Sequence, residues 1–179
     1  KVQKRDFQQR EFDVKGRVVR EKSLTVGPKG EFISRRETVN SKFDAQGRAQ
    51  QTKTAVYGSD GKVVETLVAQ NSYDAAGNLQ MSKTERYDGA SGRLLDTNIV
   101  SRTYDALGNV SRQRSTQIHA NGKVISESVT DFKDYDLNGN ARQTNTTTLR
   151  NGLLTTSERT ITKVDSLGRS VAEKTLEKD

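Results

Sequence analysis

Apolar residues return at fixed places along this chain, and long polar stretches separate them. When the sequence is aligned with itself at an interval of about 31 residues, apolar residues recur two and ten positions after one repeated glycine. They recur again just after a second repeated glycine. The stretches between them are polar on both alternating faces, as in residues 142–148, Arg-Gln-Thr-Asn-Thr-Thr-Thr. No segment has a 3.6-residue apolar stripe, and Val, Ile, Thr, Tyr and Phe are frequent, so the pattern predicts strands rather than helices.

A six-residue phrase, aromatic-Asp-x-x-Gly-Asn/Arg, sets this interval. Its copies begin at residues 12, 43, 73, 104, 135 and 164, so successive starts are 31, 30, 31, 31 and 29 residues apart. The first residue is Phe, Phe, Tyr, Tyr, Tyr and, in the last copy, Val. A fixed period in this range indicates stacked supersecondary units. We therefore interpret residues 1–179 as a single array of about five to six hairpin repeats, cut from a larger protein.

Each phrase predicts a tight turn, which we call a phrase turn. An Asp that opens a turn can accept hydrogen bonds from backbone N–H groups two residues on, and a closing Gly adopts the left-handed conformation. A looser intervening turn, which ends at Gly30, Gly61, Gly92, Gly122 or Gly152, lies between each pair of phrases. The predicted structural residues of the phrase turns are Asp13, Gly16, Asp44, Gly47, Asp74, Gly77, Asp105, Gly108, Asp136, Gly139, Asp165 and Gly168.

Eleven turns divide the chain into twelve segments, most of them long enough for a strand of about ten residues. Strands joined by short turns run antiparallel. Hydrophobic residues make up only 31% of the chain, which is too few for a thick core. The sequence thus predicts an all-β fold: one long antiparallel meander, a single-layer twisted sheet of about twelve strands, or a segment of a spiral shell.

The phrase Tyr-Asp-x-x-Gly-Asn/Arg, with an aliphatic residue two positions after the Gly, resembles the tyrosine-aspartate (YD) repeat of Rhs proteins, teneurins and toxin-complex C subunits. Tyr73-Asp74, Tyr104-Asp105 and Tyr135-Asp136 match it strictly, and the copies at 12, 43 and 164 less so. The resemblance implies β-hairpins that wind into a hollow shell, in a large secreted or surface-exposed protein, usually bacterial. The period is longer here than in many members, so the strands are expected to be longer.

We interpret the chain as a structural scaffold, a wall or stalk segment, located outside the cell or on its surface. Its expected partners are further repeats of the same parent chain, or other copies through the sheet edges. One alternative is a carbohydrate-binding adhesion module, in which Tyr73, Tyr104 and Tyr135 would stack on the sugar rings of cell-surface glycans. A second alternative is a sheet that associates into filaments through its open edges.

The sequence gives little support for catalysis or for cofactors. There is no cysteine, and His119 is the only histidine, so no enzyme, cofactor or metal site is predicted. Residues 134–139, Asp-Tyr-Asp-Leu-Asn-Gly, imitate half of a calcium loop, but its twelfth position is Asn145 rather than Glu, and the turn explains the pattern. The net charge of +7 is spread along all segments without a basic run, so nucleic-acid binding is not expected. No stretch approaches the roughly 20 apolar residues of a membrane-spanning helix.

Overall fold

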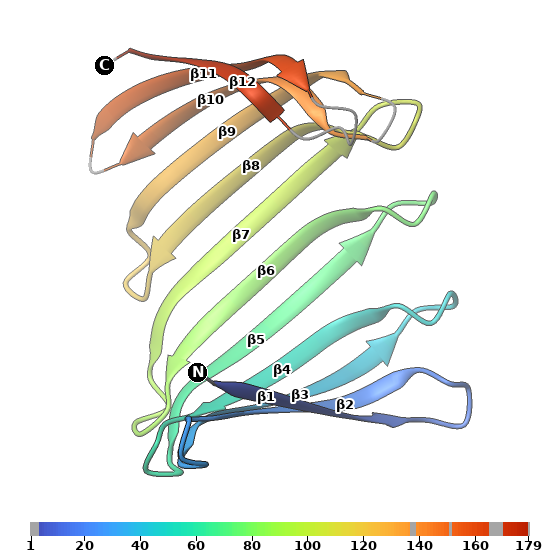
Figure 1. The fold of residues 1–179 in the computed structure, drawn as a ribbon, viewed down its shortest axis with the longest axis vertical. Helices are drawn as coiled ribbons and strands as arrows, with labels where there is room; N and C mark the ends of the chain where they lie inside the picture. The colour runs from blue at the N-terminus through green and yellow to red at the C-terminus, as the bar shows by residue number, and fades with distance from the viewer. Residues whose placement is uncertain (1–3, 137–138, 151, 165–169, 179) are drawn as a thin grey trace. The chain divides into compact units, whose positions relative to one another are not determined.

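Twelve strands form one open antiparallel meander in a computed structural model, which describes residues 4–136, 139–150, 152–164 and 170–178 (Figure 1). Each strand is hydrogen-bonded to its neighbours in chain order. This confirms the predicted all-β class and meander. The strands are β1 (Arg5–Phe12), β2 (Val18–Val26), β3 (Phe32–Phe43), β4 (Ala49–Tyr57), β5 (Val63–Tyr73), β6 (Leu79–Asp88), β7 (Leu94–Tyr104), β8 (Val110–His119), β9 (Val124–Tyr135), β10 (Ala141–Arg150), β11 (Leu153–Val164) and β12 (Ser170–Lys178).

The apolar columns of the sequence lie at the strand ends. The residue two positions after each phrase Gly is the first residue of an even-numbered strand, from Val18 in β2 to Ser170 in β12. At the other end, the columns beside the intervening turns face one another across four of the hairpins: Val26 and Phe32, Tyr57 and Val63, Ile118 and Val124, Leu149 and Leu154. Cross-strand pairs of this kind contribute roughly 0.2–1 kcal/mol each.

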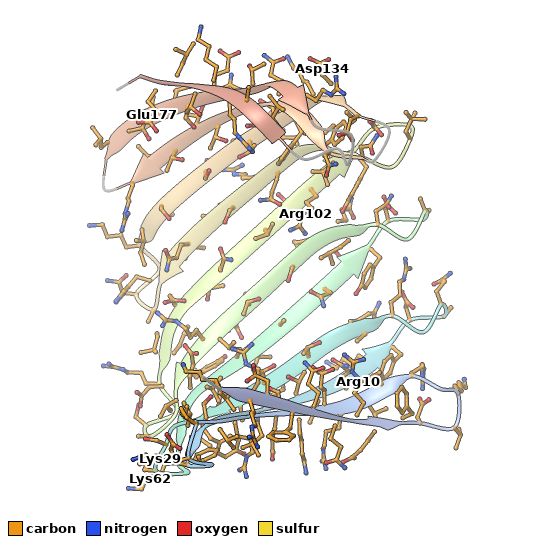
Figure 2. The ribbon with its side chains drawn as sticks, viewed as in Figure 1. Arg10, Lys29, Lys62, Arg102, Asp134 and Glu177 are labelled. Atoms are coloured by element: carbon orange, nitrogen blue, oxygen red, sulfur yellow. The ribbon has the colours of Figure 1, made fainter. Side chains whose placement is uncertain are left out.

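The described part of the chain contains no buried hydrophobic residue. Its buried residues are Gly27 and three polar residues, Thr54, Asp96 and Thr97. Side chains project from both sides of the strands (Figure 2), and Phe12 and Phe7 expose 60% and 53% of their surface. Stability therefore depends on ladder hydrogen bonds, cross-strand pairs and turns more than on a dry interior.

The chain divides into two compact units. The first comprises Lys1–Ser72 and Lys83–Thr97, and the second comprises Tyr73–Ser82 and Asn98–Asp179. In the first unit, Lys29 and Lys62 belong to two intervening turns and lie at the same end of the strands (Figure 2). No helix within the described ranges is long and apolar enough to cross a membrane.

Two strands contain a non-glycine residue in the left-handed region just before the aromatic of a phrase. These residues are Lys42, with φ of 52°, and Asp134, with φ of 54°. On either side of Lys42, Ser41 pairs with Gln51 and Phe43 with Ala49, so the two strands stay in register around the kink.

Candidate functional site: the repeated phrase turn

The five phrase turns in the described part of the chain share one backbone geometry. In each, the Asp N–H donates to the carbonyl four residues later at 2.8–3.0 Å, and the Gly N–H donates back to the Asp carbonyl at 3.0–3.1 Å. The glycine φ angles lie between 76° and 98°, in the left-handed region where a side chain is strained. The sixth predicted turn, with Asp165 and Gly168, lies outside the described residues.

Each aspartate also fastens its turn through Oδ1. The backbone N–H of the last phrase residue donates to this oxygen in all five turns, at 2.8–3.0 Å. In three of the turns the N–H two residues after the Asp donates to the same atom, for example Leu107 to Asp105 at 2.9 Å. In a fourth turn the Ala76 N–H also donates to the Asp74 carboxylate. A shorter or longer side chain could not reach both groups, which explains why the phrase uses Asp.

The sixth residue of the phrase has a role that we did not predict from the sequence. Its side chain donates to the second carboxylate oxygen of the Asp in the same turn. Arg17 Nε lies 2.6 Å from Asp13 Oδ2, and Asn109 Nδ2 lies 3.0 Å from Asp105 Oδ2. Arg48, Asn78 and Asn140 make the equivalent bond. The signal in the sequence is that this position holds only Arg or Asn, which both carry a side-chain N–H of suitable reach.

These bonds lower the pKa of four turn carboxyls, those of Asp13, Asp44, Asp74 and Asp105. For Asp13 the main cause is the side-chain hydrogen bond from Arg17, and for Asp105 it is the one from Asn109, with backbone N–H donors adding to both. At Asp44, burial acts most strongly and in the opposite direction, but the backbone and side-chain hydrogen bonds from Arg48 outweigh it, so the pKa of that carboxyl is also lowered. A carboxylate held ionised in this way suits a structural anchor more than an acid–base catalyst.

Two phrase tyrosines in the second unit, Tyr104 and Tyr135, bind the backbone of the preceding repeat. The Tyr104 hydroxyl donates to the Leu79 carbonyl at 2.7 Å, and the Tyr135 hydroxyl donates to the Val110 carbonyl. Burial first, and then the nearby negative charge of Asp105, raise the pKa of Tyr135. Tyr73 ends β5 and is half-buried. The role of these three residues in glycan stacking stays a prediction.

Asparagine takes over this contact in the first unit. Val18 and Ala49 begin β2 and β4, as Leu79 and Val110 begin β6 and β8. Asn40 Nδ2 donates to the Val18 carbonyl at 3.0 Å, and Asn71 Nδ2 donates to the Ala49 carbonyl at 3.4 Å. Four successive even-numbered strands thus begin with a carbonyl that accepts a side-chain hydrogen bond from the strand that follows.

A cation–π contact also joins neighbouring phrases in the first unit. The Arg17 guanidinium carbon lies 4.2 Å from the centroid of the Phe43 ring, which opens the next phrase. Arg17 therefore binds its own Asp and covers the aromatic of the following repeat. Such a contact adds about 0.5–1 kcal/mol at an exposed site.

Three of the intervening turns use the same hydrogen bonds as the phrase turns. They open at Gly27, Gly58 and His119, whose N–H groups donate to the carbonyl four residues later at 2.8–3.0 Å. His119 Nδ1 also accepts the Asn121 N–H at 3.3 Å, so the single histidine belongs to a turn. Within the described ranges, no group of three or more His, Asp or Glu residues could hold a metal ion.

Comparison with known proteins gives no family. No family model matches the chain, and no curated protein matches it. Among solved structures, the chain is similar to a porin-like protein from Bacteroides vulgatus ATCC 8482, with 14% sequence identity and a TM-score of 0.47. The similarity covers 94% of this chain and 85% of the other.

Proposed function

We propose that this chain is a structural repeat scaffold, a wall or stalk segment of a large secreted or cell-surface protein of the YD-repeat type. One observation carries the proposal: in four successive repeats the first strand carbonyl, at Val18, Ala49, Leu79 or Val110, accepts a hydrogen bond from a side chain of the strand that follows. At Leu79 and Val110 the donor is the tyrosine that opens the next repeat. The residues that the phrase repeats are thus engaged in holding the array together. Repeat arrays derive their stability from such nearest-neighbour contacts.

The carboxylates of the phrase support the same role. An Asp occurs at this position in every copy of the phrase. In the five turns that the structure describes, both of its oxygens accept hydrogen bonds, and at Asp105 these bonds stabilise the charge within the turn. A catalytic pair would instead be unique and placed in a cleft. A scaffold of this kind can be lengthened by adding repeats, because each added repeat makes the same contacts with its neighbours.

The test is to lengthen the array. A second copy of residues 104–134, inserted directly after residue 134, should be accommodated as one more repeat and should raise the midpoint of urea unfolding, since it adds an interface of the same kind. The matched control is an insertion of the same length with Asp105 and Gly108 of the added copy changed to Ala, which should lower the midpoint. If both insertions are equally disruptive, the chain is not a modular scaffold.

A glycan array separates this proposal from adhesion. The scaffold is expected to bind no sugar on the array. Retention of a glycan by the chain, and its loss when Tyr104 and Tyr135 are changed to Ala but not when they are changed to Phe, would instead favour the adhesion module.

A further inference from the structure

One face of β1–β4, all within the first unit, carries exposed apolar groups beside charged ones. The registers of these strands run without a shift over three rows of directly opposite residues, which therefore share a face. We call this surface the three-row face. Its rows are Phe7, Leu24, Arg35 and Tyr57; Gln9, Lys22, Glu37 and Ala55; Glu11, Arg20, Val39 and Lys53.

Four charges of the three-row face are placed antisymmetrically about a line between β2 and β3, while Arg35 and Arg20 lie opposite the uncharged Leu24 and Val39. In the second row, Lys22 on β2 lies beside Glu37 on β3. In the third row, Glu11 on β1 and Lys53 on β4 occupy the two outer positions. The outer positions of the first row both hold a ring, Phe7 and Tyr57, and Phe7 is 53% exposed.

This pattern is self-complementary. A two-fold rotation about that line, with the axis in the plane of contact, places β2 over β3 of a second copy and β1 over β4. Every charged position then meets an opposite charge or an uncharged group. The facing pairs are Phe7 and Tyr57, Leu24 and Arg35, Lys22 and Glu37, Gln9 and Ala55, Glu11 and Lys53, Arg20 and Val39.

We propose that the three-row face binds a second copy of this chain, face to face, in a two-fold symmetric dimer. An isologous interface requires such a self-complementary surface, and opposite charges across it exclude other registers. Exposed apolar groups rimmed by charges are typical of interaction sites. The proposal goes beyond the scaffold role and does not rest on it, because it concerns the face of the sheet rather than the contacts between repeats.

A groove on the same face can receive the second copy. It has a volume of about 340 Å³, and Phe7, Leu24, Phe32 and Arg35 are among its lining residues. The Arg35 guanidinium carbon lies 3.9 Å from the centroid of the Tyr57 ring, which gives the face a flat, partly cationic ridge beside the groove. The two-fold rotation brings this ridge over Phe7 and Leu24 of the other copy, where the Tyr57 ring can pack against Phe7.

The size of the face predicts a weak dimer. Four strands at ~4.8 Å and five residues at ~3.4 Å define a patch of about 330 Å² per copy, or about 650 Å² in total. An interface of that size lies below the range of stable specific complexes. We therefore expect association only at high protein concentration, with a dissociation constant on the order of 100 μM.

The experiment is sedimentation equilibrium of the whole chain at increasing concentration. The wild-type chain should shift from monomer to dimer. Lys22→Glu sets a second carboxylate against Glu37 of the other copy at two symmetric positions and should weaken the dimer at least ~10-fold. The charge swap Lys22→Glu/Glu37→Lys should restore association with itself, while a mixture of swapped and wild-type chains should form fewer mixed dimers than like ones.

Three further variants separate loss of the interface from effects on folding. Phe7→Ser should weaken association, whereas Phe12→Ser removes an equally exposed ring from β1 outside the three rows and should leave it unchanged. Arg36→Glu, on the opposite face of β3, is the matched charge control. Far-UV circular dichroism checks that each variant is folded. A monomer at all concentrations, or a dimer that Lys22→Glu and Phe7→Ser do not weaken more than their controls, overturns the proposal.

Discussion

The Tyr104 hydroxyl donates a hydrogen bond of 2.7 Å to the carbonyl oxygen of Leu79, a residue of the preceding repeat. Tyr104→Phe keeps the ring and removes the donor, which leaves the Leu79 carbonyl without this partner. We expect the free energy of unfolding to fall by about 1–3 kcal/mol, the range for a half-buried hydrogen bond whose acceptor loses its donor. Urea unfolding followed by circular dichroism measures the change.

Tyr87 supplies the matched control for that measurement. Its hydroxyl donates to Glu85 at 2.8 Å, but Glu85 also accepts a hydrogen bond from Lys83 at 2.6 Å and keeps it when the hydroxyl is removed. Tyr87→Phe should therefore destabilise the chain less than Tyr104→Phe. Equal losses in the two variants would show that the contact with Leu79 has no special importance.

The phrase aspartates make stability depend on pH. The folded-state pKa of Asp13, Asp44, Asp74 and Asp105 lies below the ordinary value of 3.8. A lowered folded pKa contributes stability that is fully present above the unfolded pKa and is lost as pH falls through the folded pKa. The urea midpoint should therefore hold steady from neutral pH to about pH 5 and fall below about pH 4. Asp105→Asn should start from a lower midpoint and lose less of it on acidification.

The sequence predicted the strands and turns because they are local. Asp105, Gly108 and the residues between them carry all the information for a turn. Strands joined in succession by such short turns pair with their neighbours in the chain, so the sheet is a meander. The hydrogen bond from the Asn109 side chain to the Asp105 carboxylate was not predicted, although the sixth position of the phrase always holds Arg or Asn. A side-chain hydrogen bond inside a turn gives no periodic apolar signal. The hydrogen bond from Tyr104 to Leu79 could not be predicted, since it joins residues 25 positions apart in the sequence that meet only when β6 and β7 pair.

Gly89 and Gly92 lie in one intervening turn and should respond differently to substitution. A Cβ on Gly89 would lie 2.2 Å from the Val63 carbonyl oxygen, and the Gly89 N–H donates to the Val64 carbonyl at 3.1 Å. Gly92 has open space around it, but its φ is +67°. Gly92→Ala should thus cost about 1–2 kcal/mol from the left-handed backbone alone. Gly89→Ala should cost more, because backbone must move.

Asparagine separates the two causes at these glycines. It tolerates the left-handed region better than alanine, so Gly92→Asn should recover part of the loss seen with Gly92→Ala. Gly89→Asn should recover nothing, because the obstacle there is the space that a Cβ needs. Thermal unfolding of the four variants gives the comparison, and a recovery at Gly89 would contradict the close approach to Val63.

Lys42 offers a substitution that should stabilise the chain. Its φ of 52° is unfavourable for lysine, whereas the equivalent position before Tyr135 holds Asp134, a residue type that enters this region more readily. Lys42→Asn should therefore raise the free energy of unfolding by about 0.5–1 kcal/mol, without the flexibility that glycine adds to the unfolded chain. Thr103 precedes Tyr104 in the same way but has no left-handed backbone, so Thr103→Asn should give no gain. A gain in urea unfolding that is the same at both positions would trace the effect to the asparagine side chain rather than to the backbone at Lys42.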